Sequence, residues 1–533
     1  MLTGARRTLG AALVGSALVI SALSTSGCRT DGDDIERWTN TTQGPKKLVA
    51  VLTHDKYPLE LRVEAAMALV KMKPRGGRRV GILGTDDQIG LVGALEALQP
   101  AEREKIVDAM VPLLEEEMKR PPPKAQAGQP TPPDPSFPYK DAAFALLTHS
   151  DGSLVQSEEN RKRLRAALTD WCMTDFAVRM DESSQLYGME QVLRELGAQG
   201  VAQLPAQIDA NAKKIDKMSD LIAELGDAKA KLEASQNLVK VAQEVDSEHW
   251  VKQKAPGVEA ANKASKLNPT PEQFKLQLEA YQEEELLRVF SSMKKVGGAP
   301  VVDYLLGYAQ DKAKPEKRRA AALAALEGNM DKNNPAHVKA VLAIASASDT
   351  PDSIRDVALR RVGELPRKLV VDDLFGLFSN ENWKIRWVAA ELVLKMSDTS
   401  NINEFMRKIG SVRDMAITEP LRYGALLADL KGKEKPEEIA DKYATRNYPV
   451  PARLSALGYY YEKGTKDQLS KVEKYADDRS RVPECREDAQ DCEWRCAVGE
   501  GKSQEVKDVS TVGDFVSYCI KPAMEKRSSE KKK

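Results

Sequence analysis

The chain has 533 residues, of which 42% are hydrophobic, 30% are charged and 5% are aromatic. Its 80 Lys and Arg residues balance its 80 Asp and Glu residues, so the formal net charge is zero. This composition excludes wholesale disorder, which requires low hydrophobicity and high net charge. It also argues against a nucleic acid partner, because binding by phosphate neutralisation needs a basic surface.

The first residues have the order of a secretory signal. Arg6 and Arg7 are followed by an uncharged apolar run from Leu9 to Leu23 and then by small residues. A basic start, an apolar stretch and small residues at a cleavage point define such signals. The apolar run is shorter than the ~20 residues that span a bilayer as a helix, so we expect export and cleavage.

A cysteine, Cys28, follows the small residues 24–27 directly. This arrangement resembles the lipobox of bacterial lipoproteins, although Thr25 stands where that family favours an aliphatic residue. The resemblance implies removal of residues 1–27, a diacylglycerol on the Cys28 sulfur and a further acyl chain, such as palmitate, on the new amino terminus. It implies a lipid-anchored envelope protein, with residues 28–43 as a flexible tether. Arg29, in place of an aspartate, favours the outer membrane, with the protein facing the periplasm or the cell surface.

Four of the six cysteines lie close to the carboxyl end, at Cys485, Cys492, Cys496 and Cys519. A zinc site is one interpretation, but the spacing lacks the paired C-x-x-C of such sites. An exported protein lies in an oxidising compartment, where cysteines pair. We therefore expect two disulfides that staple a cap over residues 481–525, and among three possible connectivities we favour pairing of nearest neighbours. Cys172, in an apolar helical context, is expected to be a buried free thiol.

An Arg-x-x-Ala motif that opens an apolar helix recurs along the chain. Its arginines are Arg62, Arg318, Arg355, Arg386, Arg422 and Arg453, and the last five are separated by 37, 31, 36 and 31 residues. A period of this size indicates a helical solenoid. The arginines are expected to bond to carboxylates or carbonyls of the adjacent turn and so to join one repeat to the next.

The segments 61–69 and 385–394 resemble the second helix of HEAT repeats. The resemblance implies an all-α fold, an α-α superhelix whose concave surface holds other proteins. We expect repeats over residues 44–200, with a Pro-rich surface insert at 121–138, and again over 272–480. Between them, residues 201–271 combine heptad-spaced long helices with a polar loop from residue 246. Residues 526–533 are expected to be a basic disordered tail.

The sequence carries little that points to catalysis. Its four histidines, His54, His149, His249 and His337, are isolated and are expected at the surface, and no hydrolase or dinucleotide motif is present. Gly501-Lys502-Ser503 imitates the end of a phosphate loop, but Cys496 stands where that motif requires a glycine. We expect no catalytic residue, metal site, cofactor or small-molecule substrate.

Two aromatic clusters are the candidate partner-binding residues. Trp383 and Trp387 lie one helical turn apart, and Tyr459, Tyr460 and Tyr461 form a run. They either fill the seams between repeats or form a patch for a partner on the concave face, since Tyr and Trp dominate interface hot spots.

The sequence thus predicts a non-catalytic, membrane-tethered scaffold or assembly factor that binds proteins of the cell envelope. Two alternatives stay open. One is an envelope enzyme of unrecognised type, which would need a polar pocket with converging carboxylates. The other is a structural envelope component that associates with itself.

Overall fold

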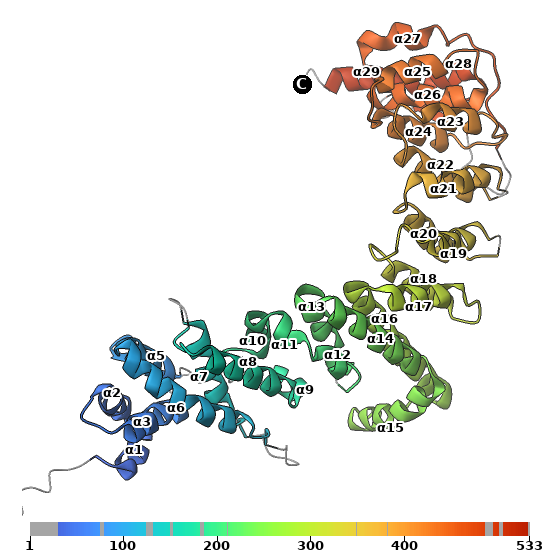
Figure 1. Ribbon diagram of the computed structural model, residues 1–533. Coiled ribbons are helices and arrows are strands. Elements are labelled where there is room, and N and C mark those ends of the chain that lie inside the picture. Colours follow the sequence, from blue (N-terminus) through green and yellow to red (C-terminus); the bar gives the residue numbers. More distant parts are fainter. Residues whose placement is uncertain are drawn as a thin grey trace, which may run out of the picture. The chain divides into compact units, whose positions relative to one another are not determined.

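The computed structural model is a chain of helices (Figure 1). It describes residues 30–74, 79–123, 132–149, 153–181, 186–210, 212–347, 349–380, 382–485, 494–499 and 505–530. Cys28 and Cys492 lie outside these ranges. The contacts divide the chain into two compact units, Met1–Asn237 and Leu238–Lys533, and each is considered by itself. Within the described residues, no helix is both long enough and apolar enough to cross a bilayer.

Unit 1 consists of successive helices that pack on one another, with one short hairpin. Contacts run from α3 to α6, from α6 to α8, from α8 to α10 and from α10 to α13. The elements are α1 (Gly32–Thr39), α2 (Gly44–Thr53), α3 (Leu59–Lys71), α4 (Val80–Leu83), β1 (Gly84–Thr85), β2 (Gln88–Ile89), α5 (Leu91–Glu96), α6 (Pro100–Met118), α7 (Phe137–Thr148), α8 (Glu158–Met173), α9 (Phe176–Asp181), α10 (Met189–Leu196), α11 (Ala198–Val201), α12 (Leu204–Gln207) and α13 (Ile215–Leu225).

Helix α14 (Ala228–Val245) leads into unit 2, where helices form a stacked array. Its helices are α15 (Glu248–Ala264), α16 (Pro271–Val296), α17 (Ala299–Gln310), α18 (Glu316–Ala325), α19 (Pro335–Ser346), α20 (Asp352–Val362), α21 (Arg367–Gly376), α22 (Trp383–Lys395), α23 (Ile402–Ile409), α24 (Thr418–Ala428), α25 (Pro436–Tyr443), α26 (Val450–Lys463) and α27 (Leu469–Glu473). Helices α17 and α18, α19 and α20, α21 and α22, and α25 and α26 contact as pairs. The first helices contact in the order α17, α19, α21. Among the second helices, α18 contacts α20, α22 contacts α24, and α24 contacts α26. This is the arrangement of an α-α solenoid, which the repeated motif in the sequence predicted.

In four helix pairs, a buried arginine at the fourth position of the second helix joins the two helices. The side chains donate to carbonyls at the end of the preceding helix, whose last carbonyls have no partner within their own helix. The bonds are Arg62 to Leu52 (2.8 Å), Arg319 to Ala309 (2.9 Å), Arg355 to Ala347 (2.9 Å) and Arg386 to Asn380 (2.7 Å). All four arginines are 7% exposed or less. The expected bonding to carbonyls is confirmed, but these bonds join the two helices of one pair and not one repeat to the next.

The set of arginines needs correction at three positions. In α26, Arg453 is buried but pairs with Asp478 and donates to Ser480 Oγ (3.2 Å), and both of these residues follow its own helix. In α18 the carbonyl is bound by Arg319, whereas Arg318 pairs with Asp246 at 2.9 Å. In α24 the motif arginine Arg422 is exposed and pairs with Glu391 of α22 at 2.8 Å. The spacing of the motif does not show which of two neighbouring arginines binds the carbonyl, or where each helix begins.

Helices α24 and α26 approach closely at two glycines. A Cβ atom on Gly424 would lie 1.9 Å from the carbonyl carbon of Gly458, and one on Gly458 would lie 2.1 Å from the carbonyl oxygen of Pro420. No side chain fits at either position, so backbone meets backbone at this seam.

Three segments expected to be irregular are helical. The tether prediction for 28–43 is wrong over 32–39, because the Asp31 side chain caps α1 and Ile35 is 1% exposed. The loop expected from residue 246 is largely α15, which is capped by Ser247 and anchored by Trp250 against Tyr281 (5.1 Å between ring centroids).

The basic tail also begins later than predicted. Helix α29 (Lys521–Glu530) continues beyond residue 526, and Arg527 donates to the carbonyls of Gly464 and Tyr461. Part of the Pro-rich insert, 124–131, lies outside the described residues. Its end is not at the surface as expected, since Asp134 and Ser136 are 6% and 0% exposed.

The heptad pattern of residues 208–245 holds only in its first half. Ile208, Ile215, Met218 and Ile222 are 0% exposed, whereas Leu232 is 49% exposed. The chain breaks at Gly226, and the buried stripe of α14 instead uses Ala230, Ala234 and Leu238. Because the chain is not helical at Gly226, the heptad positions of α13 do not continue into α14.

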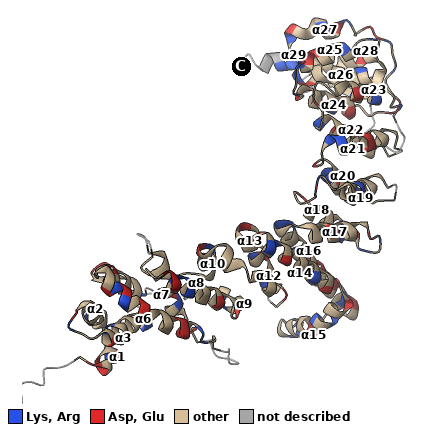
Figure 2. Ribbon diagram, viewed as in Figure 1, with Lys and Arg blue, Asp and Glu red and all other residues tan. Residues whose placement is uncertain are grey.

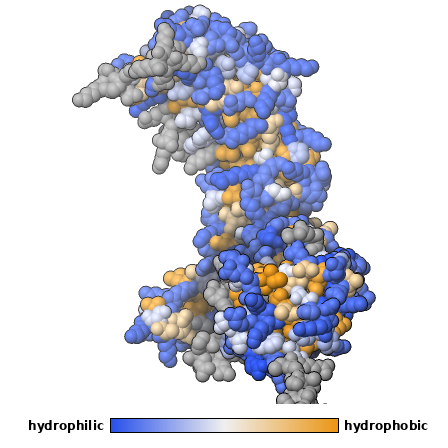
Figure 3. Space-filling model, turned by 90° about the vertical axis from the view of Figure 1, so that its left-hand side faces the viewer, coloured by the Kyte–Doolittle hydropathy of each residue, from blue (hydrophilic) through white to orange (hydrophobic). Residues whose placement is uncertain are grey.

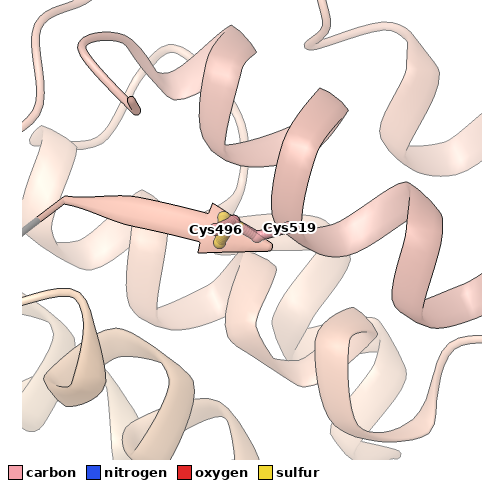
Figure 4. The surroundings of a disulfide bond; sticks show 2 residues. All are labelled: Cys496 and Cys519. Atoms are coloured by element: carbon pink, nitrogen blue, oxygen red, sulfur yellow. A yellow bond between two sulfur atoms is a disulfide. The ribbon is translucent and has the colours of Figure 1, made fainter. Parts of the chain in front are cut away.

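The carboxyl-terminal cap is held by a disulfide. Strands β3 (Arg495–Val498) and β4 (Glu505–Asp508) form an antiparallel hairpin, followed by α28 (Val512–Asp514) and a π-helical turn η5 (Phe515–Ile520). Cys496 of β3 is bonded to Cys519 of η5 (Figure 4). Cys485 is also disulfide-bonded, and Cys172 is free and buried as expected. The hairpin docks on the array through Trp494, whose indole N–H donates to the Met415 carbonyl (2.9 Å).

We expect Arg355→Ala to loosen the α19–α20 pair by about 2–3 kcal/mol, because the Ala347 carbonyl loses a charged donor. Hydrogen exchange of the α19 and α20 amides measures this local stability. The control is Arg360→Ala, which removes an exposed arginine of the same helix and should change protection by less than about 0.5 kcal/mol. Equal effects of the two substitutions would contradict the joining role.

Candidate functional site

The tryptophan pair lies on the face formed by the second helices of unit 2. Trp383 and Trp387 of α22 are both half-buried and stack with ring centroids 5.8 Å apart and an interplanar angle of 13°. Ile385 and Ala389 of the same helix are buried against the array. Figure 3 shows hydrophobic residues between hydrophilic ones on the face that lies on the left in Figure 1, over the region of α18 to α24.

Charged contacts beside the pair hold α22 in place. Arg386 donates to Asp414 (2.7 Å) in addition to the Asn380 carbonyl. Glu391 bridges Lys395 (2.7 Å) and Arg422 (2.8 Å). Burial raises the pKa of Glu391, but the hydrogen bonds from these two cations outweigh it and the pKa is lowered. The ion pairs of Glu391 with Lys395 and Arg422 thus form an ionic frame beside the tryptophans.

The three tyrosines do not join this pair in one patch. Tyr460 is 1% exposed and donates to Asp441, so it is a core residue and its assignment to a partner surface is wrong. Tyr459 is half-buried, packs against the Tyr460 ring and has its pKa raised by burial and by Glu437. Tyr461 lines a cavity of ≈ 720 Å³ beside the Cys496–Cys519 disulfide. Consecutive helical residues point in different directions, so a run of three divides among three environments.

Unit 1 contains a fully buried ion pair that sequence reasoning missed. Lys140 and Asp141 are both 0% exposed, and the Lys140 ammonium lies 2.6 Å from the Asp141 carboxylate. Asp141 also accepts from the backbone N–H groups of Leu186 (3.0 Å) and Tyr187 (3.2 Å). Burial lowers the pKa of Lys140 despite the neighbouring carboxylate. The pair fastens the segment before α10 to α7 and has a structural role; its only signal in the sequence is two charges within an apolar helix.

A second buried cluster closes the ends of the Pro-rich insert. Arg179 is 1% exposed, pairs with Asp134 (3.0 Å) and donates to the carbonyls of Trp171 (2.6 Å) and Arg120 (3.1 Å). The neighbouring Cys172 thiol has its pKa raised to about 12 by burial, which keeps it protonated and unreactive. Within the part of the chain that the structure describes, no three His, Cys, Asp or Glu side chains are placed to hold a metal ion.

Histidines were expected at the surface, and two depart from this: the His149 side chain is only 16% exposed, and His337 is buried. His337 is 6% exposed, and its Nε2 lies 3.0 Å from an Asp303 carboxylate oxygen. His54, by contrast, is exposed as expected and lies beside Asp55. His337 follows the N-cap of α19, where the helix start buries it against α17.

A buried glutamate supports the loop on which the cap docks. Glu419 of α24 is 3% exposed and accepts from the Ala416 backbone N–H at 2.9 Å. Burial raises its pKa to about 7, although that hydrogen bond and Arg386 act in the opposite direction. The adjacent Met415 binds both Glu484, through its N–H, and Trp494, through its carbonyl. We therefore expect ionisation of Glu419 to change how firmly the cap docks on this loop.

Comparisons with known proteins give no family. No protein-family profile and no curated protein matches the chain. A crystal structure of a Kap121p mutant is similar at 13% sequence identity and a TM-score of 0.30, over 86% of this chain and 44% of that chain. This chain therefore spans less than half of the length of that protein. A TM-score this low carries no argument, so the fold and the site rest on the residues of this chain.

We expect the docking of the cap to weaken as the pH rises. In the unfolded chain Glu419 ionises at about 4.5, whereas in the folded chain it ionises at about 7. Its stabilising contribution is full below pH 4.5 and is lost as the pH rises through 7, at most about 3 kcal/mol.

Glu419→Gln mimics the protonated form and should make cap docking independent of pH over this window. Hydrogen exchange of η5 and α29 amides, measured on both sides of the window, tests this. Glu438→Gln is the control, because it removes a glutamate of α25 outside this loop. An unchanged pH dependence in Glu419→Gln would refute the assignment.

Proposed function

We propose that the protein is a non-catalytic scaffold that binds another protein of the bacterial cell envelope. The observation that carries the proposal is the stacked pair Trp383–Trp387 on the face of the second helices. Tryptophans are enriched at interface hot spots because one ring offers a large apolar surface at little conformational cost. A solenoid supports this function, since its repeats present an extended face on a rigid frame.

The ionic frame around α22 favours a protein partner over a flexible ligand. Glu391, Lys395 and Arg422 fix charges of both signs beside the rings. Interfaces of this kind have an aromatic centre and a charged rim, and the rim selects the partner more than it adds affinity. The partner is therefore expected to carry an apolar side chain at its centre and charges of both signs around it.

We further propose that the mature protein is anchored to the membrane by lipid on Cys28 and is exposed to the periplasm or the cell surface. The support is the order of basic, apolar and small residues before Cys28. Two or more acyl chains give a stable anchor, because each buried methylene contributes ~0.8 kcal/mol. Two disulfides are consistent with an oxidising compartment.

We expect Trp383→Ala/Trp387→Ala to weaken partner binding by about 30-fold, the effect of losing a hot spot of about 2 kcal/mol. In-membrane crosslinking with mass spectrometry identifies the partner of the wild type, and its affinity for purified variants is then measured. Trp38→Ala removes a half-buried tryptophan of unit 1 that lies under Lys47 and is the matched control. If both variants bind the partner equally well, the pair is only a packing feature.

We expect Cys28→Ser to abolish incorporation of labelled palmitate and to release the protein from the outer-membrane fraction. Cys172→Ala is the control, because Cys172 is a buried free thiol. Metabolic labelling and fractionation measure both effects. Retention of label or membrane association in Cys28→Ser would contradict the anchor while leaving the scaffold proposal to its own test.

A further inference from the structure

A groove crosses the surface of unit 1 between α1, α3 and α6. It has a volume of ≈ 330 Å³. Its floor is apolar and comprises Ile35, Met67 and Leu113, of which Leu113 is 44% exposed. An unbranched Met beside an exposed Leu gives a floor that adapts to different apolar guests. The groove is formed by residues of unit 1 alone, so it is separate from the tryptophan pair.

The rim of the groove is acidic. Glu36, Glu64, Glu116 and Glu117 line it, against one cation, Lys71. Among the described residues, Glu36 and Glu64 have no ion-pair partner, and Glu116 has only Lys119 at 3.6 Å. Acidic residues are seen on α1 and α6 in Figure 2. The two unpaired carboxylates, Glu36 and Glu64, beside an apolar floor favour a cationic ligand over an anionic one.

Two polar groups of the groove wall point to a ligand independently of this charge. Tyr139 is 5% exposed and lines the groove, yet its hydroxyl has no hydrogen-bond partner within the described residues. The Oε2 atom of Glu117 is buried without a partner, while Oε1 of the same carboxylate binds Arg120 at 2.7 Å. Burial and the Glu117 charge both raise the pKa of Tyr139. The unpaired buried oxygen of Glu117 costs free energy unless a ligand donor satisfies it, and the Tyr139 hydroxyl is available to the same ligand.

We infer that this groove binds a cationic amphipathic segment of a partner protein. The apolar side chains of the segment lie on Met67 and Leu113, and its Lys or Arg side chains reach Glu36, Glu64 and the free oxygen of Glu117. A helix with apolar residues at positions i, i+3 and i+4 and basic residues beside them has this pattern. The site extends the proposed scaffold to a second type of contact and does not depend on the tryptophan pair.

The test uses the full chain and a short fluorescent peptide of Leu and Lys in helical spacing. Its affinity is measured by anisotropy at low and at high salt. We expect saturable binding that weakens with salt, and about fivefold weaker binding to Glu36→Gln/Glu64→Gln, since two exposed charge contacts contribute about 1 kcal/mol together. Leu113→Ser should weaken binding by a similar factor, through the apolar floor.

The control variant is Glu104→Gln/Glu159→Gln, which removes two exposed glutamates outside the groove and so changes the net charge by as much as the groove variant does. It should bind within about twofold of the wild type. Circular dichroism shows whether each variant is folded. The inference is overturned if the peptide does not bind, if the control loses as much affinity as the groove variant, or if a Leu and Glu peptide binds equally well.

Discussion

The array depends on one hydrogen bond that is repeated from pair to pair. A buried arginine at the fourth position of the second helix donates to a carbonyl at the end of the first, as Arg62, Arg319, Arg355 and Arg386 do. The last carbonyls of any helix lack partners, and the negative end of the helix dipole favours a cation there. One side chain therefore satisfies the helix end and fixes the angle at which the chain returns.

The same frame leaves two different surfaces to the solvent. In unit 2 it supports a stacked aromatic pair bordered by ion pairs, whereas in unit 1 it supports an apolar groove with an acidic rim. Both depend on side chains that the repeat does not require, because the repeat prescribes only the inward positions. A solenoid can in this way vary its contacts without changing its core. The ion pairs Lys140–Asp141 and Arg179–Asp134 are instead buried, and they hold segments between helices in place and do not form a surface.

The repeat, the bonding of buried arginines to carbonyls and the Cys496–Cys519 bond could be predicted from the sequence, because each follows from a local pattern or from the compartment. Other features could not. Helix α15 forms although its sequence is polar, because Ser247 caps it and the Trp250 ring packs against Tyr281. Tyr460 is buried and its neighbours are not, which depends on where α25 lies. The groove of unit 1 brings together residues from positions 35 to 139, and no spacing in one sequence reveals such a meeting.

The contact between Gly424 and Gly458 has a mechanical consequence. Backbone atoms meet there without intervening side chains, so α24 cannot slide or rotate on α26 without collision. The two helices and the cap fastened to them move as one rigid block. If the array flexes to receive a partner, the motion must occur at seams filled by rotatable side chains, such as Leu342 and Leu369 between α19 and α21.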